Sequence, residues 1–336
     1  MLKIGLIGAG YMGGMHSACY EALKELGASV TAVADLREDK RNTAAAQFQA
    51  ACYKTGMELI EQADVDVVDI CLPTYLHTEH ALAAMKMGRA VFIEKPVCLT
   101  PEEGRTLLEA QRKYGSTVMV GQCIRFWDEY VWLKEAIDGK RYGRIQSAVF
   151  QRVSPYPDWS WNSWLHRSEC SGTVALDMHV HDIDFIRFLM GDPIGISAAA
   201  SRSGGAIYQI FTTLEYPDAA VHAEACWDYP KDFPFSMSFR VKCEQATIVY
   251  DSSSPEGLVV YPRTGGALKP EIVRQFRGES GAGGNISSLG GYYNELRYFV
   301  ECLNTGREPV IAPLCEAVQS MELCRRGIEL AGGTDL

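Results

Sequence analysis

Three glycines near the start of the chain have a spacing that can bind phosphate groups. They lie in the run Gly8-Ala9-Gly10-Tyr11-Met12-Gly13, which fits the pattern G-x-G-x-x-G. The first glycine permits a tight turn, the second lets the backbone approach a pyrophosphate, and the third lets a helix pack closely on a strand. A short apolar run precedes the pattern and helical spacing follows it, so the helix N-terminus can present free N–H groups to phosphates. The pattern predicts a dinucleotide site.

A carboxylate in the next segment bears on which dinucleotide is bound. Asp35 ends the second predicted strand, 22 residues after Gly13. It can accept hydrogen bonds from the ribose hydroxyls of NAD and would repel the 2′-phosphate of NADP. Arg37 favours the opposite choice, because a guanidinium can pair with that phosphate. A simpler alternative is that Asp35 only caps the next helix. We expect NAD as the cofactor, with NADP as the other candidate.

Polar side chains also follow three later strands. The run Cys71-Leu72-Pro73-Thr74-Tyr75-Leu76-His77 ends one strand, the triplet Glu94-Lys95-Pro96 follows the next, and Gln122 follows the last. Ligands of open parallel sheets bind at the carboxyl ends of the strands. We therefore expect Leu72, Glu94, Lys95 and Gln122 to line the cofactor crevice.

A second group of candidate residues lies in the middle of the chain. Asp177, His181 and Asp184 are spaced to share one face of a helix. A neutral histidine can accept a hydroxyl proton near neutral pH, although a structural histidine is the simpler alternative for His181. His179 and His181 also form an H-x-H pattern. Residues two apart on a helix point about 200° apart, so we expect no metal site.

The elements that must position these residues fall into two regions. Up to residue 120, uniformly apolar strands alternate with helices, which predicts a Rossmann-type, doubly wound parallel sheet covered on both faces. Beyond it, long alternating segments and helices at 128–137, 177–190, 292–303 and 314–330 predict an α+β domain with a large, mostly antiparallel open sheet. We expect a dinucleotide-binding domain at 1–122 and a substrate-binding, catalytic and oligomerisation domain at 123–336. Residues 263–289 are rich in Gly and Ser and predict a loop.

Composition excludes several classes of protein. With 32 Lys and Arg against 42 Asp and Glu, the formal charge is −10, and an acidic chain is poorly suited to a phosphate backbone. We find no signal peptide and no apolar run long enough for a membrane span. The eleven cysteines contain no C-x-x-C pair. We expect a cytoplasmic protein without nucleic-acid or membrane partners.

The ordered set of motifs resembles the Gfo/Idh/MocA oxidoreductases, named for glucose–fructose oxidoreductase and inositol dehydrogenase. The matching segments are the glycine loop ending in His16, the triplet Glu94-Lys95-Pro96, the stretch from Gly172 to Asp184, and the closing stretch from Tyr293 to Pro309. The resemblance covers nearly the whole chain. It implies a nicotinamide-dependent dehydrogenase that acts on CH–OH groups.

The resemblance also implies roles for individual residues. Lys95 matches the lysine beside the reactive carbon, and His181 matches the general base on the substrate hydroxyl. Asp177 matches the carboxylate that orients the substrate and the histidine. We therefore expect Lys95 and His181 to serve the same substrate carbon. The cofactor-lining segment of the family is matched by Pro73, Thr74 and His77. Many relatives carry Asn at the position of Thr74, and often Gly at that of His179.

The substrate side is less defined. Arg125 has two open interpretations, a contact with substrate or phosphate and an interdomain salt bridge. The run Trp159-Ser160-Trp161-Asn162-Ser163-Trp164 places tryptophans among small polar residues. Trp161 and Trp164 could stack on a sugar ring while Asn162 bonds its hydroxyls, or the run could pack as an ordinary loop. Relatives often carry Trp-Arg where this chain has Trp164 and Leu165, which argues against a strongly anionic substrate.

The leading hypothesis is an NAD(P)-dependent dehydrogenase of a secondary hydroxyl in a cyclic, inositol-like polyol, a sugar or a sugar derivative. Two alternatives stay open. One is a glycoside hydrolase that uses bound NAD transiently, and the other is a ligand-sensing regulator without turnover. The resemblance further implies a homodimer or homotetramer that assembles through the C-terminal sheet.

Overall fold

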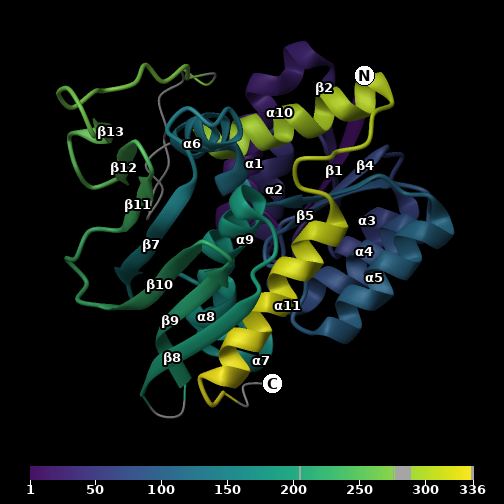
Figure 1. Ribbon diagram of the computed structural model, residues 1–336. Coiled ribbons are helices and arrows are strands. Elements are labelled where there is room, and N and C mark those ends of the chain that lie inside the picture. The colour runs from purple at the N-terminus through teal and green to yellow at the C-terminus, as the bar shows by residue number, and fades with distance from the viewer. Residues whose placement is uncertain (204–205, 275, 277–288, 334–336) are drawn as a thin grey trace. The chain divides into compact units, whose positions relative to one another are not determined.

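The computed structural model describes residues 1–203, 206–274, 276 and 289–333. Contacts divide the chain into two compact units (Figure 1). Unit 1 comprises Met1–Cys123 and Leu289–Met321, and unit 2 comprises Ile124–Ser288 and Glu322–Leu336. Of the predicted loop, residues 275 and 277–288 lie outside the described part of the chain.

Unit 1 contains a six-stranded sheet in which every described strand pair is parallel. The strand order is β3-β2-β1-β4-β5-β6, with the change of direction between β1 and β4. The strands are β1 Leu2–Ile7, β2 Ala28–Ala34, β3 Ala51–Tyr53, β4 Val67–Ile70, β5 Ala90–Glu94 and β6 Val118–Gly121. The helices are α1 Tyr11–Leu23, η1 Lys24–Leu26, α2 Glu38–Phe48, α3 Gly56–Gln62, η2 Thr74–Leu76, α4 His77–Lys86, α5 Pro101–Tyr114 and α10 Gly290–Thr305. The predicted Rossmann-type sheet is confirmed.

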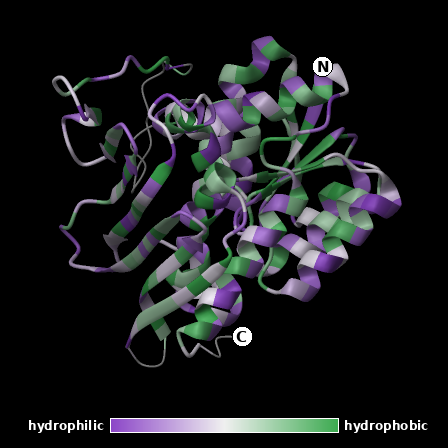
Figure 2. Ribbon diagram, in the orientation of Figure 1, coloured by the Kyte–Doolittle hydropathy of each residue, from purple (hydrophilic) through white to green (hydrophobic). Residues whose placement is uncertain are grey.

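The core of unit 1 lies on the central strands, which Figure 2 colours as hydrophobic. All four residues of β4 are buried, as are the last four of β5. Helix α10 packs on α1, and Phe299 of α10 meets Phe92 of β5 with ring centroids 5.6 Å apart. This apolar contact explains why residues 289–321 group with unit 1, although we expected one domain to span 123–336.

Unit 2 is built on a seven-stranded sheet in the order β13-β12-β11-β7-β10-β9-β8. Its strands are β7 Ile145–Pro155, β8 Gly195–Ser203, β9 Ala206–Tyr216, β10 Ala219–Tyr229, β11 Ser236–Cys243, β12 Ala246–Asp251 and β13 Gly257–Pro262. Only the β7–β10 pair is parallel among the described pairs, so the predicted, mostly antiparallel sheet is confirmed.

Several short helices connect and cover this sheet. They are η3 Cys123–Phe126, which starts at the last residue of the first segment of unit 1, α6 Asp128–Asp138, η4 Trp161–His166, α7 Ser168–Ser171, α8 Thr173–Asp177 and α9 His179–Met190. Helix α11, Leu314–Leu330, begins in unit 1 and ends in unit 2. Helices α8 and α9 contact β7, β9 and β10, so they cover one face of the sheet.

The prediction of a single helix over 177–190 is wrong at its start, because the helical conformation is interrupted at Met178. Helix α8 ends at Asp177 and α9 begins at His179. The N–H of His181 donates to the carbonyl of Met178, three residues back, at 3.3 Å. This tighter turn means that Asp177 and His181 are not one regular helical turn apart.

Candidate active site

The glycine loop of unit 1 has the geometry that its sequence predicts. Gly8 has φ +93°, and a Cβ added there would lie 2.5 Å from the carbonyl oxygen of Cys71. A Cβ at Gly13 would lie 1.8 Å from the carbonyl oxygen of Gly8. These contacts exclude side chains at both positions. Gly10 is the N-cap of α1 and, having no side chain, leaves the first N–H groups of the helix uncapped. An uncapped helix N-terminus beside a tight loop fits the pyrophosphate of a dinucleotide.

Asp35 and Arg37 form a pair at the end of β2. The Nε and Nη2 of Arg37 donate to the two carboxylate oxygens of Asp35 at 2.9 and 2.8 Å. The N–H of Ala9 donates to the same carboxylate at 2.8 Å, which ties Asp35 to the glycine loop. Burial alone raises the pKa of Asp35, but the hydrogen bonds from Arg37 and Ala9 outweigh burial and lower it. Asp35 therefore stays ionised, with its charge shared by a neighbouring guanidinium.

The helix that follows the glycine loop carries a buried histidine that we did not single out as a site residue. His16 of α1 places Nδ1 2.8 Å from Asp69 of β4 and Nε2 3.0 Å from Glu94 of β5. Tyr20 donates its hydroxyl to Asp69 at 3.0 Å. Burial lowers the pKa of His16, but Asp69 and Cys71 outweigh burial and raise it well above its usual value. His16 is thus a buried imidazolium between two carboxylates, and its signal in the sequence was its place just after the glycine loop.

Glu295 of α10 completes this buried cluster. Its carboxyl group is fully buried, and one of its oxygens lies within 4.8 Å of a ring nitrogen of His16 and a carboxylate oxygen of Glu94. Burial and the charge of Glu94 raise the pKa of Glu295 well above its usual value. Both nitrogens of His16 contact carboxylates, whereas neither carboxyl oxygen of Glu295 has a hydrogen-bond partner among the described residues.

The segments after β4 and β5 carry most of the other predicted cofactor residues. Glu94 accepts a hydrogen bond from the N–H of Lys95 at 3.0 Å. His77 is buried, with Nδ1 2.8 Å from the carbonyl of Pro96 and Nε2 2.7 Å from the carbonyl of Leu72. Burial lowers the pKa of His77, and its two backbone contacts offset part of that effect. His77 therefore links the two segments, an arrangement that its sequence position alone did not indicate.

Three predicted residues at this edge differ in their surroundings. Thr74 is 2% exposed, and its hydroxyl has no hydrogen-bond partner among the described residues. Pro73 is the N-cap of the short helix η2. Gln122 is buried just after β6, and its N–H donates to Val120 at 2.7 Å. A buried hydroxyl without a partner, on the same edge as the glycine loop, is consistent with a polar ligand there.

In unit 2, the carboxylates after His181 belong to buried ion pairs. The Nε and Nη2 of Arg125 each donate to Asp184 at 2.7 Å, and both side chains are 1% exposed. Arg152 of β7 pairs with Asp182 at 3.0 and 3.1 Å. The salt-bridge interpretation of Arg125 is thus the one seen, within unit 2 rather than between domains. A contact between Arg125 and substrate, the other interpretation, stays a prediction.

His181 and Asp177 themselves lie on either side of the break at Met178. His181 is 9% exposed and Asp177 is half-buried. His179 is buried and contacts the hydroxyl of Thr212 at 2.9 Å. Burial lowers the pKa of His179 to about 3, so it is a neutral structural histidine. The imidazole at this position fills a core site of α9 and β9.

The tryptophan run forms an exposed loop around η4. Trp159 is 53% exposed and Trp161 is 39% exposed, whereas Trp164 is half-buried. Asn162 is exposed with φ 50°, a left-handed conformation that Asn tolerates better than most residues. The loop is anchored by Leu165, which is buried, and η4 contacts α7 and α8. The loop thus packs on the helices that lead to Asp177.

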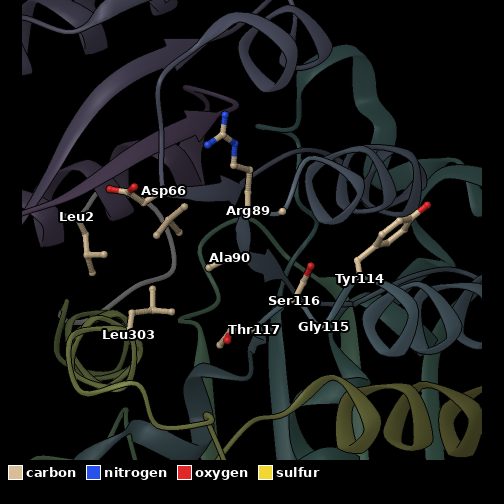
Figure 3. A pocket seen from close by; sticks show the side chains of 11 residues that line it. Leu2, Asp66, Arg89, Ala90, Tyr114, Gly115, Ser116, Thr117 and Leu303 are labelled. Carbon is tan, nitrogen blue, oxygen red and sulfur yellow. The ribbon is translucent and has the colours of Figure 1, made fainter.

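Unit 1 also has a pocket of about 290 Å³, whose lining side chains are drawn in Figure 3. Leu2, Val67, Ala90 and Thr117 line it, at or just before the first residues of β1, β4, β5 and β6. It therefore opens at the amino ends of the strands. Open α/β sheets bind ligands at the carboxyl ends, so this pocket is not the predicted crevice.

Comparison with known proteins matches both parts of the chain. Residues 2–122 match the model described as "Oxidoreductase family, NAD-binding Rossmann fold", and residues 130–249 match the GFO/IDH/MocA C-terminal domain. The chain belongs to the Gfo/Idh/MocA family. Its first segment is accordingly an NAD-binding domain, in agreement with the glycine loop and Asp35.

Individual relatives of this Gfo/Idh/MocA chain are dehydrogenases by name. It is 31% identical over 205 residues to the inositol 2-dehydrogenase of Rhizobium meliloti, a match covering 60% of this chain and 58% of that protein. It is 30% identical over 226 residues to the levoglucosan dehydrogenase of Pseudarthrobacter phenanthrenivorans, covering 61% and 57%. The matches thus span less than two thirds of these relatives.

A solved structure extends the likeness in fold to nearly the whole chain. Levoglucosan dehydrogenase in complex with NADH and levoglucosan superposes with a TM-score of 0.85 at 22% identity, covering 98% of this chain and 97% of that one. At this identity the likeness concerns the fold.

None of the described helices is long and apolar enough to cross a membrane.

Proposed function

We propose that this protein is an NAD-dependent dehydrogenase that oxidises a secondary hydroxyl of a cyclic polyol, a sugar or a sugar derivative. The observation that carries the proposal is a shared edge in unit 1. The glycine loop follows β1 and Lys95 follows β5, so a dinucleotide site and a cationic side chain lie at the carboxyl edge of one parallel sheet. That edge is where such sheets bind and act on ligands.

The proposed chemistry gives each catalytic side chain one task. When bound, NAD accepts the hydride that leaves the carbinol carbon. His181 accepts the hydroxyl proton as general base, which neutral imidazole can do near pH 7. The ammonium group of Lys95 stabilises negative charge on the substrate oxygen as its proton leaves. Asp177 orients His181 and the substrate through its carboxylate.

The substrate class is supported by the relatives and by the tryptophan loop. The relatives named above are an inositol and a levoglucosan dehydrogenase. Trp161 offers an exposed indole face, and stacking on such faces binds the apolar side of a sugar ring. Asn162 is exposed and can bond hydroxyls, with Trp164 beside it. Leu165 adds no charge, which suits a neutral polyhydroxylated ring.

We also propose a homodimer or homotetramer that assembles through the sheet of unit 2. The face opposite α8 and α9 carries half-exposed side chains, including Phe211 stacked on His222 with ring centroids 5.8 Å apart. Light scattering at several concentrations tests the assembly.

Free cysteines suit the reducing conditions of the cytoplasm, which we propose as the location of the protein.

The direct test is a screen for reduced nicotinamide by its absorbance. The panel comprises inositols, aldoses, amino sugars and glycosides, each with NAD and with NADP. We expect NAD reduction with at least one cyclic polyol or sugar. Release of sugar from a glycoside without net NADH would favour the hydrolase instead. Tight NAD binding without any turnover would favour the regulator.

Single substitutions test the assigned roles. Lys95→Ala and His181→Ala should each lower kcat by about 10²-fold or more, because each removes a group that acts in the transition state. NADH binding, followed by fluorescence, should survive in both. Lys86→Ala and His80→Ala are matched controls on α4 and should leave kcat unchanged. Near-normal turnover in both catalytic variants would eliminate the mechanism.

A further inference from the structure

Two histidines from different helices connect the carboxyl ends of β4 and β5. His16 comes from α1, and His77 is the first residue of α4. Both side chains are buried, at 0% and 1% exposure. Each places one ring nitrogen on the β4 side and the other on the β5 side. Two such bridges at one strand pair call for an explanation beyond packing.

The first bridge runs between carboxylates. Nδ1 of His16 lies 2.8 Å from Oδ2 of Asp69 in β4, and Nε2 lies 3.0 Å from Oε1 of Glu94 in β5. The other oxygen of Glu94, Oε2, accepts the N–H of Lys95 at 3.0 Å. His16 therefore fixes the carboxylate that in turn holds the backbone of Lys95 on its N-terminal side.

The second bridge runs between backbone carbonyls. Nε2 of His77 lies 2.7 Å from the carbonyl of Leu72, after β4, and Nδ1 lies 2.8 Å from the carbonyl of Pro96, after β5. A neutral ring donates to one of these oxygens and a protonated ring donates to both. In either state the imidazole spans the gap between the two segments. It holds the backbone on the C-terminal side of Lys95.

Lys95 is thus the one residue between two anchored neighbours, Glu94 and Pro96. We propose that His16 and His77 are positioning residues that together fix the backbone of Lys95, and hence the origin of its catalytic side chain. We call the two bridges, made by His16 and His77, the clamp. The inference about catalysis rests on the proposed function of Lys95, whereas the existence of the clamp does not depend on that function. The lysine side chain is long and flexible, so its ammonium group can be positioned accurately only if the Cα atom is itself held in place. Displacement of a catalytic group by about 1 Å can cost about 10²-fold in rate.

The chain offers a matched control for His77. His80 lies three residues later on α4, is also buried, and contacts a backbone carbonyl through Nδ1, that of Leu76 at 2.9 Å. That carbonyl precedes α4 and belongs to neither β4 nor β5. His77→Gln and His80→Gln therefore make the same chemical change at neighbouring sites. Only the first should loosen Lys95.

The experiment compares these two variants with the wild type in the full chain. Hydrogen–deuterium exchange of residues 93–98 reports the backbone of Lys95, and kcat and KM on the best polyol report catalysis. For His77→Gln we expect exchange to rise about tenfold, as for loss of one hydrogen bond. We expect kcat to fall about tenfold or more while KM for the polyol changes little. His80→Gln should match the wild type in all three.

The outcomes separate the clamp from the proposed function. Unchanged exchange in His77→Gln overturns the clamp, and raised exchange with normal kcat overturns its role in catalysis. A wild type that oxidises no polyol defeats the proposed function, while the exchange data still decide whether the clamp exists. His16→Gln is the second arm, read by exchange alone if the variant folds. Raised exchange there supports the bridge through Glu94, and wild-type exchange overturns it.

Discussion

The two regions that carry the expected catalytic residues are held in place by different forces. In unit 1, the segment after Lys95 is held by the hydrogen bonds of His77 to two backbone carbonyls, whereas the segment before it depends on the charged His16. In unit 2, His181 is followed by Asp182 and Asp184, each in a buried ion pair with an arginine. Hydrogen-bonded links lose one bond when a partner is removed, whereas a broken buried ion pair leaves a bare charge. The region around His181 should therefore be more sensitive to single changes of charge than the segment after Lys95.

The largest expected effect comes from Asp184. Asp184→Asn leaves the Arg125 guanidinium buried without its counter-charge and should lower the free energy of unfolding by about 3–5 kcal/mol. Denaturant unfolding of the holoprotein measures the change. The double variant Arg125→Met with Asp184→Leu should recover most of the loss, because it removes both charges.

A matched change in unit 1 sharpens that comparison. Tyr20→Phe removes the hydroxyl that donates to Asp69 at 3.0 Å and should cost only about 1 kcal/mol, since His16 still serves the carboxylate. Equal losses of unfolding free energy in Asp184→Asn and Tyr20→Phe would contradict the expected difference between the two regions.

Gly13→Ala should have the next largest effect, and on ligand binding more than on fold. The added Cβ would meet the carbonyl of Gly8 at 1.8 Å, so the glycine loop must move. A displacement that costs about 3 kcal/mol would weaken NADH binding by about 10²-fold. Fluorescence titration with NADH measures it. Gly14→Ala is the control, because an added Cβ there meets nothing within 4 Å; wild-type affinity in Gly13→Ala would contradict the predicted site.

His179 in unit 2 should make the free energy of unfolding depend on pH. Burial lowers the pKa of His179 to about 3, so its imidazole is neutral in the folded state, while in the unfolded chain it protonates below about 6.5. Stability is therefore lost as pH falls from about 6.5 toward 3, by up to about 1.4 kcal/mol per pH unit from this residue. His179→Gln should lessen the fall of Tm over that range. Parallel pH profiles of variant and wild type would disprove the assignment.

A further small effect is expected on the choice of cofactor. Asp35→Ser removes the carboxylate that now engages Arg37 and leaves the guanidinium available to a 2′-phosphate. The ratio of kcat/KM for NADP to that for NAD should rise about tenfold. Steady-state rates with both cofactors measure it. An unchanged ratio would place the ribose away from Asp35.

The sequence predicted unit 1 better than unit 2, for physical reasons. Glycine spacing and uniformly apolar strands are local signals, so the loop at Gly8 and the parallel sheet followed from them. The links of His16 to Glu94 and of His77 to Pro96 did not, because they join residues 78 and 19 positions apart along the chain. The partner of Arg125 was equally hidden, since Asp184 lies 59 residues away. The break at Met178 escaped because helical spacing continues through it.

The central claim is that the chain moves a hydride from a carbinol carbon to NAD. Its most direct measurement uses the best substrate of the panel, carrying deuterium on the carbinol carbon, with mass analysis of the nicotinamide product. We predict that the deuterium is recovered in NADH, and that Lys95→Ala and His181→Ala form the labelled product at least about 10²-fold more slowly. Oxidised NAD and unchanged polyol after prolonged incubation with every compound of the panel would contradict the claim.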